Sequence, residues 1–138
     1  MQKLTRYFFV FAFALISSNA FAGRTAPLTN IENMPVVTGS DKAPNADQVR
    51  QAIVYAVNSA RWTASPAQDG KMIASIEVRN KHTLMVEIAY NATSYSIRYK
   101  DSINLNHDFE EDIEVIHPNA NKWMVNLKEA IRNELIRL

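Results

Sequence analysis

The residues of this chain that could do chemistry are its three histidines, its serines and one run of carboxylates. His107 and His117 flank the run, which holds Asp108, Glu110, Glu111, Asp112 and Glu114. A calcium loop needs a glycine at its sharp turn and a closing glutamate at the twelfth position, and this stretch offers neither. The histidines, His82 included, show no HExxH pair or other zinc-ligand spacing. We therefore expect a solvated acidic loop and no metal site.

Nucleophilic catalysis has equally little support. A catalytic serine needs a base, an orienting group and oxyanion donors, whereas Ser94 and Ser96 alternate along an apparent strand without a GxSxG elbow. The chain has no cysteine and only three glycines, which excludes thiol chemistry, cysteine-type zinc sites and a glycine-rich phosphate loop. The sequence therefore assigns no catalytic residue and no cofactor.

Two clusters of side chains remain as alternatives to a plain structural role. Tyr90, Tyr95, Tyr99 and Trp123 could line a ligand groove, although aromatic residues at this spacing are more typical of a core. The segment 116–123 favours a helix entry, with Asn119 or Asn121 as its cap and a buried Trp123 as its anchor. In the alternative, its polar groups meet the preceding loop at a binding surface made by Asn104, His107, His117, Asn119 and Asn121.

Alternation of apolar and polar residues predicts the elements that would position these groups. Residues 83–90 and 94–100 alternate with a period of two, which indicates an antiparallel hairpin with one packed face. Because a one-residue slip would bury its polar set, one register is preferred. It pairs Ile88 with Ile97, Val86 with Tyr99 and Glu87 with Arg98.

The other predicted elements surround this hairpin. Residues 61–66 and 71–79 read as strands, the first of them weak, and Asn80-Lys81-His82 reads as a turn. Residues 45–60 predict a helix with Asn45 and Gln48 in a capping box, and residues 119–137 predict a second helix. The predicted fold is α+β: an antiparallel three- to four-stranded meander with an N-terminal and a C-terminal helix packed on one face.

The N-terminal part of the chain predicts export. Lys3 and Arg6 precede a short apolar run, and Ala20-Phe21-Ala22 is typical of a signal-peptidase site. We expect a signal peptide at 1–22, a mostly flexible leader at 23–44 and a single domain at 45–138. Within the leader, apolar residues from Ile31 to Val37 leave open an extra edge strand.

The net charge and the predicted export limit the classes of partner that this protein could bind. The formal charge of +1 becomes −1 without Lys3 and Arg6, and such a balance argues against recruitment of nucleic acid or an anionic membrane. The apolar run is too short to stay in the bilayer as a spanning helix. We expect a soluble periplasmic protein, without stable membrane insertion, whose partner is an envelope protein or a small ligand.

Three motifs resemble a group of small uncharacterised bacterial envelope proteins, many of them of lipoprotein type. They are Ala92-Thr93-Ser94-Tyr95-Ser96-Ile97-x-Tyr99, Ser102-x-Asn104-Leu105 and Ile116-His117-x-Asn119-x-Asn121-x-Trp123. The resemblance covers residues 49–138 and implies the fold and an envelope location, but no activity. Two departures are the missing lipidation cysteine, which implies a soluble form, and Ala120, where an aromatic residue is expected.

These observations favour a periplasmic interaction or binding module over an enzyme. The alternative is a small hydrolase or metal-dependent enzyme that uses His107 or His117 with nearby carboxylates. A convergent acid–base pair in a pocket would favour that alternative.

Overall fold

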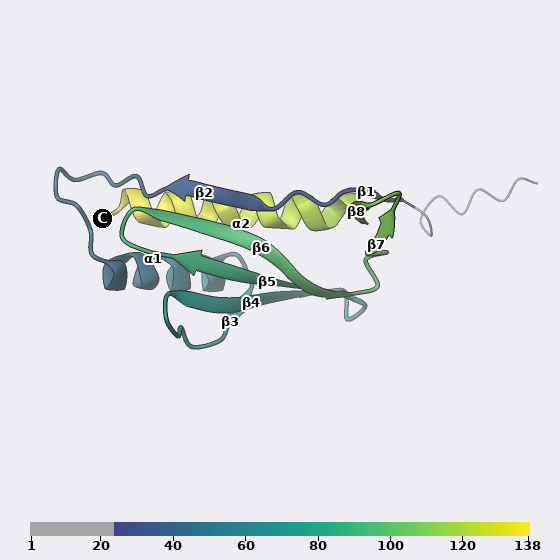
Figure 1. The fold of residues 1–138 in the computed structure, drawn as a ribbon. Coiled ribbons are helices and arrows are strands. Elements are labelled where there is room, and N and C mark those ends of the chain that lie inside the picture. Colours follow the sequence, from purple (N-terminus) through teal and green to yellow (C-terminus); the bar gives the residue numbers. More distant parts are fainter. Residues whose placement is uncertain (1–23) are drawn as a thin grey trace, which may run out of the picture.

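The computed structural model describes residues 24–138, which form two helices and two antiparallel sheets of an α+β fold (Figure 1). The predicted signal peptide at 1–22 lies outside the described residues. The elements in chain order are β1 (Ala26–Pro27), β2 (Ile31–Pro35), α1 (Ala46–Ser59), β3 (Thr63–Ala64), β4 (Lys71–Val78), β5 (His82–Tyr90), β6 (Ser94–Ile103), β7 (Asp108–Glu110), β8 (Ile113–Ile116) and α2 (Pro118–Ile136).

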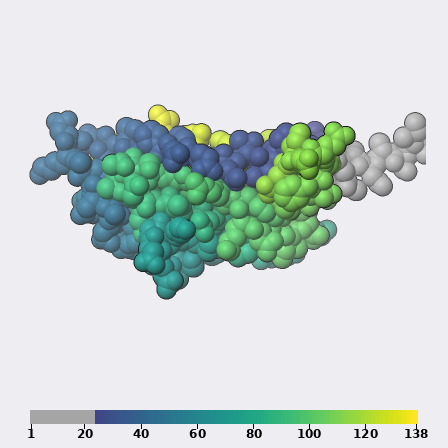
Figure 2. Space-filling model, in the orientation of Figure 1, coloured from purple at the N-terminus to yellow at the C-terminus, as the bar shows by residue number. Residues whose placement is uncertain are grey.

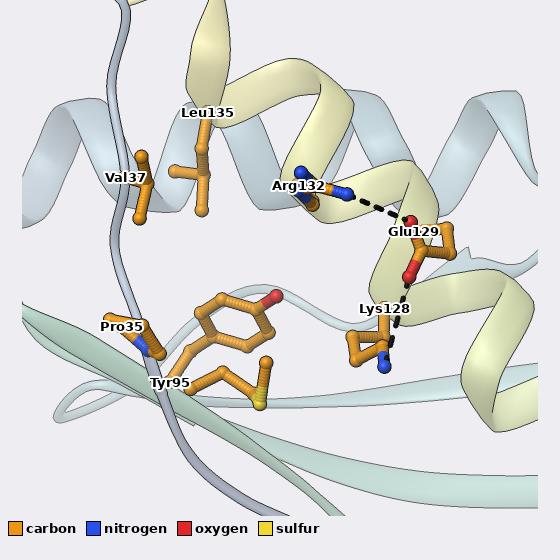
Figure 3. Close-up of a pocket in the computed structure, with 8 residues that line it drawn as sticks. Pro35, Val37, Tyr95, Lys128, Glu129, Arg132 and Leu135 are labelled. Atoms are coloured by element: carbon orange, nitrogen blue, oxygen red, sulfur yellow. Dashed lines mark ion pairs between the residues drawn. The ribbon is translucent and has the colours of Figure 1, made fainter.

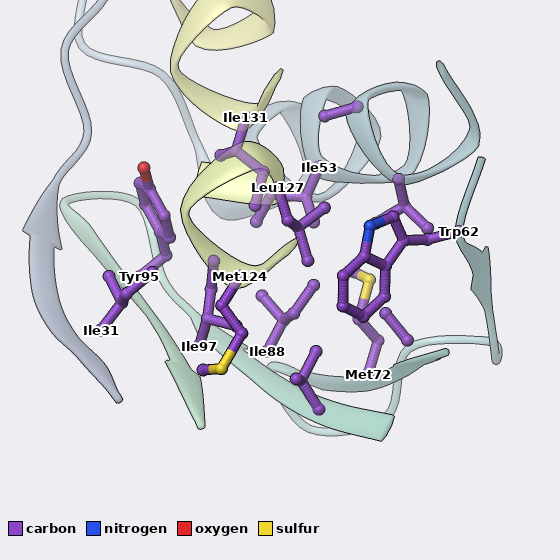
Figure 4. Packing of buried hydrophobic residues seen from close by; sticks show 14 of the residues in the cluster. Ile31, Ile53, Trp62, Met72, Ile88, Tyr95, Ile97, Met124, Leu127 and Ile131 are labelled. Atoms are coloured by element: carbon purple, nitrogen blue, oxygen red, sulfur yellow. The ribbon is translucent and has the colours of Figure 1, made fainter. Parts of the chain in front are cut away.

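The larger sheet has the strand order β2-β6-β5-β4-β3. Its β3–β6 part is the predicted meander, and β2 adds a fifth strand beside β6. The smaller sheet, with the order β1-β8-β7, was not predicted. Core side chains fill the space between the larger sheet and the two helices (Figure 4).

The register of the central hairpin is confirmed. Ile88 pairs with Ile97, and Glu87 pairs with Arg98. Beyond Tyr99 the pairing shifts by one residue, so that Met85 faces Asp101. Past this bulge β6 continues to Ile103, three residues beyond the predicted end. The extra residue of a bulge breaks the alternation of apolar and polar residues, so the sequence pattern did not reveal the last part of the strand.

The predicted cap of α1 is also confirmed. The Asn45 side chain accepts a hydrogen bond from the Gln48 amide at 2.8 Å, and the Gln48 side chain accepts one from the Asn45 amide at 3.0 Å. The buried face of the helix consists of Val49, Ala52, Ile53, Ala56 and Val57.

The segment expected to be a mostly flexible leader contributes strands to both sheets. β1 pairs with β8, and β2 pairs with β6 at the edge of the larger sheet. β2 is therefore the extra edge strand that the apolar residues from Ile31 onward had left open. Figure 2 shows this segment as a blue band along the visible face of the molecule. Arg98 binds Glu32 of β2 at 2.7 Å, although Glu87 is its cross-strand neighbour. The Gly39 amide donates to the Ile136 carbonyl at 3.0 Å, and a Cβ at Gly39 would lie 2.5 Å from that oxygen.

The region expected to be an acidic loop contains a hairpin instead. β7 and β8 pair with Glu110 opposite Ile113. The intervening Glu111 and Asp112 have φ of 49° and 66°. Two left-handed residues are typical of a tight type I′ turn, which usually carries asparagine or glycine. Because this turn carries Glu111 and Asp112 instead, the sequence contains no turn signal here and the hairpin was not predicted.

The expected role of Trp123 as a buried anchor is borne out only in part. The buried stripe of α2 consists of Ala120, Met124, Leu127, Ile131 and Leu135. Trp123 precedes Met124 and is therefore rotated by about 100° around the helix. Its indole is only partly buried, at the edge of the core. Ala120, by contrast, is fully buried.

Candidate functional site

A cavity of about 630 Å³ lies at the end of the larger sheet where α2 begins. This cavity, called the end cavity below, is lined by Arg24, Val78, Arg79, Lys81, His82, Asn104, Leu105, Asn106, His117, Asn119 and Trp123. The β4–β5 turn, the β6–β7 connection and the start of α2 lie at one end of the molecule in Figure 1. Its size falls within the range of small-molecule sites.

The β4–β5 turn and the β6–β7 connection are held together by two hydrogen bonds. His82 Nδ1 donates to the Asn104 carbonyl at 2.8 Å, and Asn104 Nδ2 donates to the Lys81 carbonyl at 2.8 Å. Arg79 and Asn104 both have φ of 56°. Asparagine adopts this left-handed conformation more readily than arginine. The lining is therefore fixed by contacts between segments more than 20 residues apart in the chain.

His117 joins the same lining from the start of α2. Its Nδ1 accepts a hydrogen bond from the Asn119 amide at 3.1 Å, and its own amide donates to the Leu105 carbonyl at 2.7 Å. Burial lowers the pKa of His117, and the positive charge of Arg24 lowers it further, with smaller effects from His82 and Lys122. A neutral ring whose Nδ1 accepts carries its proton on Nε2, which makes that atom a donor.

Positive charge dominates the end cavity. Arg24, Arg79 and Lys81 line it, and its lining contains no aspartate or glutamate. None of these three side chains takes part in an ion pair or a side-chain hydrogen bond with the residues from 24 onward. Five arginines and lysines elsewhere in the described chain do form ion pairs: Arg50, Arg98, Lys128, Arg132 and Arg137.

The structure brings together three of the five residues predicted for a binding surface. Asn104, His117 and Asn119 line the end cavity, whereas His107 and Asn121 do not. Asn121 holds the N-terminal segment: its Nδ2 donates to the Pro27 carbonyl at 2.9 Å, and its Oδ1 accepts from the Thr29 amide at 3.0 Å.

His107 lies in a cluster of its own. Its ring stacks on Tyr99 with centroids 4.4 Å apart and meets the edge of Phe109. Its Nε2 lies 2.8 Å from Glu114 Oε1. The expected acidic loop thus supplies one carboxylate to a histidine. Across residues 24–138 no three histidine or acidic side chains converge as metal ligands would.

Sequence reasoning missed the cationic half of the end cavity. Arg79 was assigned to the end of a strand, Lys81 and His82 to a turn, and Arg24 to the leader. Only the folded chain shows that a turn at 79–81 faces the start of a helix at 118. The groove alternative had named four aromatic residues, and of these Trp123 lines this cavity.

A second hollow, of about 230 Å³, lies between β2 and α2 (Figure 3). Its lining is Met34, Pro35, Val37, Tyr95, Lys128, Glu129, Arg132 and Leu135. Glu129 lies 3.7 Å from both Lys128 and Arg132, so the charges here are largely satisfied. Burial raises the pKa of Tyr95 to about 12. We regard this hollow as the weaker candidate.

Comparison with protein-family models, curated proteins and solved structures finds no match to this chain. Within residues 24–138, neither helix has the length and apolar character that a membrane crossing requires.

Proposed function

We propose that the protein is an exported binding module and that its ligand occupies the end cavity. The convergence of polar and aromatic side chains from four separate segments on one cavity carries this proposal. Several lining residues also have structural roles, but Arg24, Arg79 and Lys81 make no ion pair or side-chain hydrogen bond among residues 24–138, so such contacts do not account for their place on this lining. Within the described chain, the two histidines of the cavity hydrogen-bond backbone groups and no carboxylate, an arrangement that suits binding better than acid–base catalysis.

The export part of the proposal is supported by the N-terminal sequence and by the resemblance to envelope proteins. Cleavage after Ala22 places the module in the periplasm as a soluble protein. Mass spectrometry of the periplasmic fraction should detect a chain beginning at Gly23. Recovery of the full-length chain from the membrane fraction would contradict this part.

A small ligand fits the proposed site better than a macromolecule recruited by net charge. The volume of the end cavity suits a small molecule. An envelope protein that inserts a side chain or a chain terminus there is the other partner consistent with the sequence.

The test is retention of a molecule from the small-molecule fraction of an envelope extract. Purified protein is incubated with the fraction and washed, and the bound molecules are released for mass spectrometry. The site variant combines Trp123→Ala with His117→Asn, because asparagine preserves a capping acceptor. Asn133→Ala, on the exposed face of α2, is the control.

We expect the wild-type protein and the control to retain the same molecule and the site variant to lose it. Equal retention by the site variant, while its thermal unfolding remains cooperative, would contradict the assignment of the end cavity. A wild-type protein that retains nothing would contradict the binding function itself.

The His107–Glu114 contact favours a second candidate, a small hydrolase or metal-dependent enzyme. A carboxylate 2.8 Å from an imidazole nitrogen is the arrangement that orients a general base. Hydrolysis of a generic ester that Glu114→Gln reduces, or metal that copurifies without chelator, would give this candidate precedence. We rank it second because His107 does not line the end cavity.

A further inference from the structure

We propose that the end cavity takes a small molecule that carries a phosphate group. This inference rests on the proposed function and names the chemical class of the ligand. The sequence as a whole is nearly neutral, so the charge that selects the ligand is local.

The first observation is an uncompensated set of cations. Arg24, Arg79 and Lys81 line one cavity without a carboxylate among the lining residues. Of the ten other arginines and lysines in residues 24–138, five lie within 4 Å of an acidic side chain and five do not, so the distinctive feature of these three is that they share one cavity. Three like charges gathered around a concave surface raise the local concentration of anions and repel one another until an anion binds.

The second observation is how the charge of the possible ligands compares with the three positive charges of the lining. A single carboxylate carries one negative charge, whereas a phosphomonoester carries about 1.5 to 2 near neutral pH and offers three acceptor oxygens. Guanidinium groups match phosphate with paired N–H donors, and lysine adds a point charge. Two arginines and one lysine therefore suit a phosphate group better than a monocarboxylate.

The third observation is that further donors and an apolar surface share the lining. The neutral His117 ring carries a proton on Nε2, since its Nδ1 accepts from the Asn119 amide. The start of the 19-residue helix α2 lies at the same place and adds its positive dipole end. Trp123 provides an indole against which the organic part of the ligand can pack.

The backbone at Arg79 adds a practical advantage for testing this idea. Arg79 has φ of 56°, a conformation that asparagine tolerates well. Arg79→Asn therefore removes the charge without straining the turn. Arg61 is a matched control, because it is also an exposed arginine with positive φ, of 65°, and it does not line the cavity.

The experiment titrates the purified protein with inorganic phosphate, pyrophosphate, glycerol phosphate and malonate at constant ionic strength. Trp123 fluorescence reports binding, because the other tryptophan, Trp62, is only 3% exposed in the core. Isothermal titration calorimetry confirms each affinity. Vesicles of phosphatidylglycerol, with phosphatidylcholine as the reference, show whether the phosphate belongs to a soluble molecule or to a lipid headgroup.

We expect pyrophosphate and glycerol phosphate to bind more tightly than malonate. Arg79→Asn should weaken their binding about tenfold, the effect of one lost charge-assisted hydrogen bond. Arg61→Asn should leave the affinity within about twofold, the scatter left by long-range screened charge. Binding to phosphatidylglycerol vesicles without binding to glycerol phosphate would assign the phosphate to a membrane headgroup.

Three results would overturn the inference. They are no response to any phosphate probe, tighter binding of malonate, and equal loss of affinity in the two arginine variants. If the extract experiment yields a retained molecule without phosphate, the binding function stands and the phosphate inference fails. If the probes bind equally well to the Trp123→Ala, His117→Asn variant, the end cavity is not the site and both proposals fail.

Discussion

Asn121→Ala tests whether this residue holds the N-terminal segment rather than a ligand. The side chain makes two hydrogen bonds to the backbone of that segment, one with the Pro27 carbonyl at 2.9 Å and one with the Thr29 amide at 3.0 Å. Alanine removes both. Each bond contributes about 0.5–1.5 kcal/mol, so the loss amounts to about 1–3 kcal/mol.

Alanine also favours the helix by about 0.5 kcal/mol over asparagine, which offsets part of that loss. The net destabilisation should therefore be about 0.5–2.5 kcal/mol. At about 4 °C per kcal/mol for a chain of this size, the melting temperature should fall by about 2–10 °C. Asn133→Ala is the control, because Asn133 is an exposed residue of the same helix. It should raise the melting temperature slightly.

Hydrogen exchange locates the effect. The Thr29 amide loses its acceptor directly, whereas the Val36 amide, bonded to the Thr93 carbonyl at 2.9 Å, keeps its own. We expect faster exchange at Thr29 and little change at Val36. An Asn121→Ala protein as stable as the Asn133→Ala control, with Thr29 exchange unchanged, would refute the assigned role and return Asn121 to the candidate ligand residues.

Three further predictions concern the core, the first helix and an ionisable side chain. Leu127→Ala should cost about 2–5 kcal/mol because Leu127 is fully buried, and Trp123→Ala should cost less; chemical denaturation that reverses this order would contradict the assigned stripe of α2. Asn45→Ala should cost about 1 kcal/mol through loss of the capping box, measured by urea unfolding, and an unchanged midpoint would argue against it. The raised pKa of Tyr95, about 12 against about 10 when unfolded, contributes stability that is complete below pH 10 and is lost as the pH rises toward 12. Tyr95→Phe should remove that part of the alkaline loss, and identical alkaline unfolding of the two proteins would contradict the raised pKa.

The sequence by itself determined those elements whose signals are local. The capping box of α1 depends on two residues three positions apart, and both of its hydrogen bonds are present. The β5–β6 register follows from alternation, since any slip by one residue would expose the apolar set. Local patterns of this kind require no knowledge of what lies on the other side of the core.

Other elements depended on contacts between distant parts of the chain. Pro27 and Asn121 are 94 residues apart, and Glu32 and Arg98 are 66 apart. A short apolar segment between prolines has few local signals, and in this chain its contacts are with a distant strand and helix. Its sequence alone therefore resembles a flexible leader. The hairpin β7–β8 likewise depends on β1 for its third strand.

The candidate site likewise has residues that the sequence identified and residues that only the tertiary structure brings together. Asn104, His117 and Asn119 were identified from the polar residues that the core does not need, and they do line one cavity. The cations at 24, 79 and 81 carry no motif, because two belong to the β4–β5 turn and the third to the N-terminal segment. Their convergence is decided by the packing of α2 across the end of the sheet, which places three ordinary surface charges around one hollow.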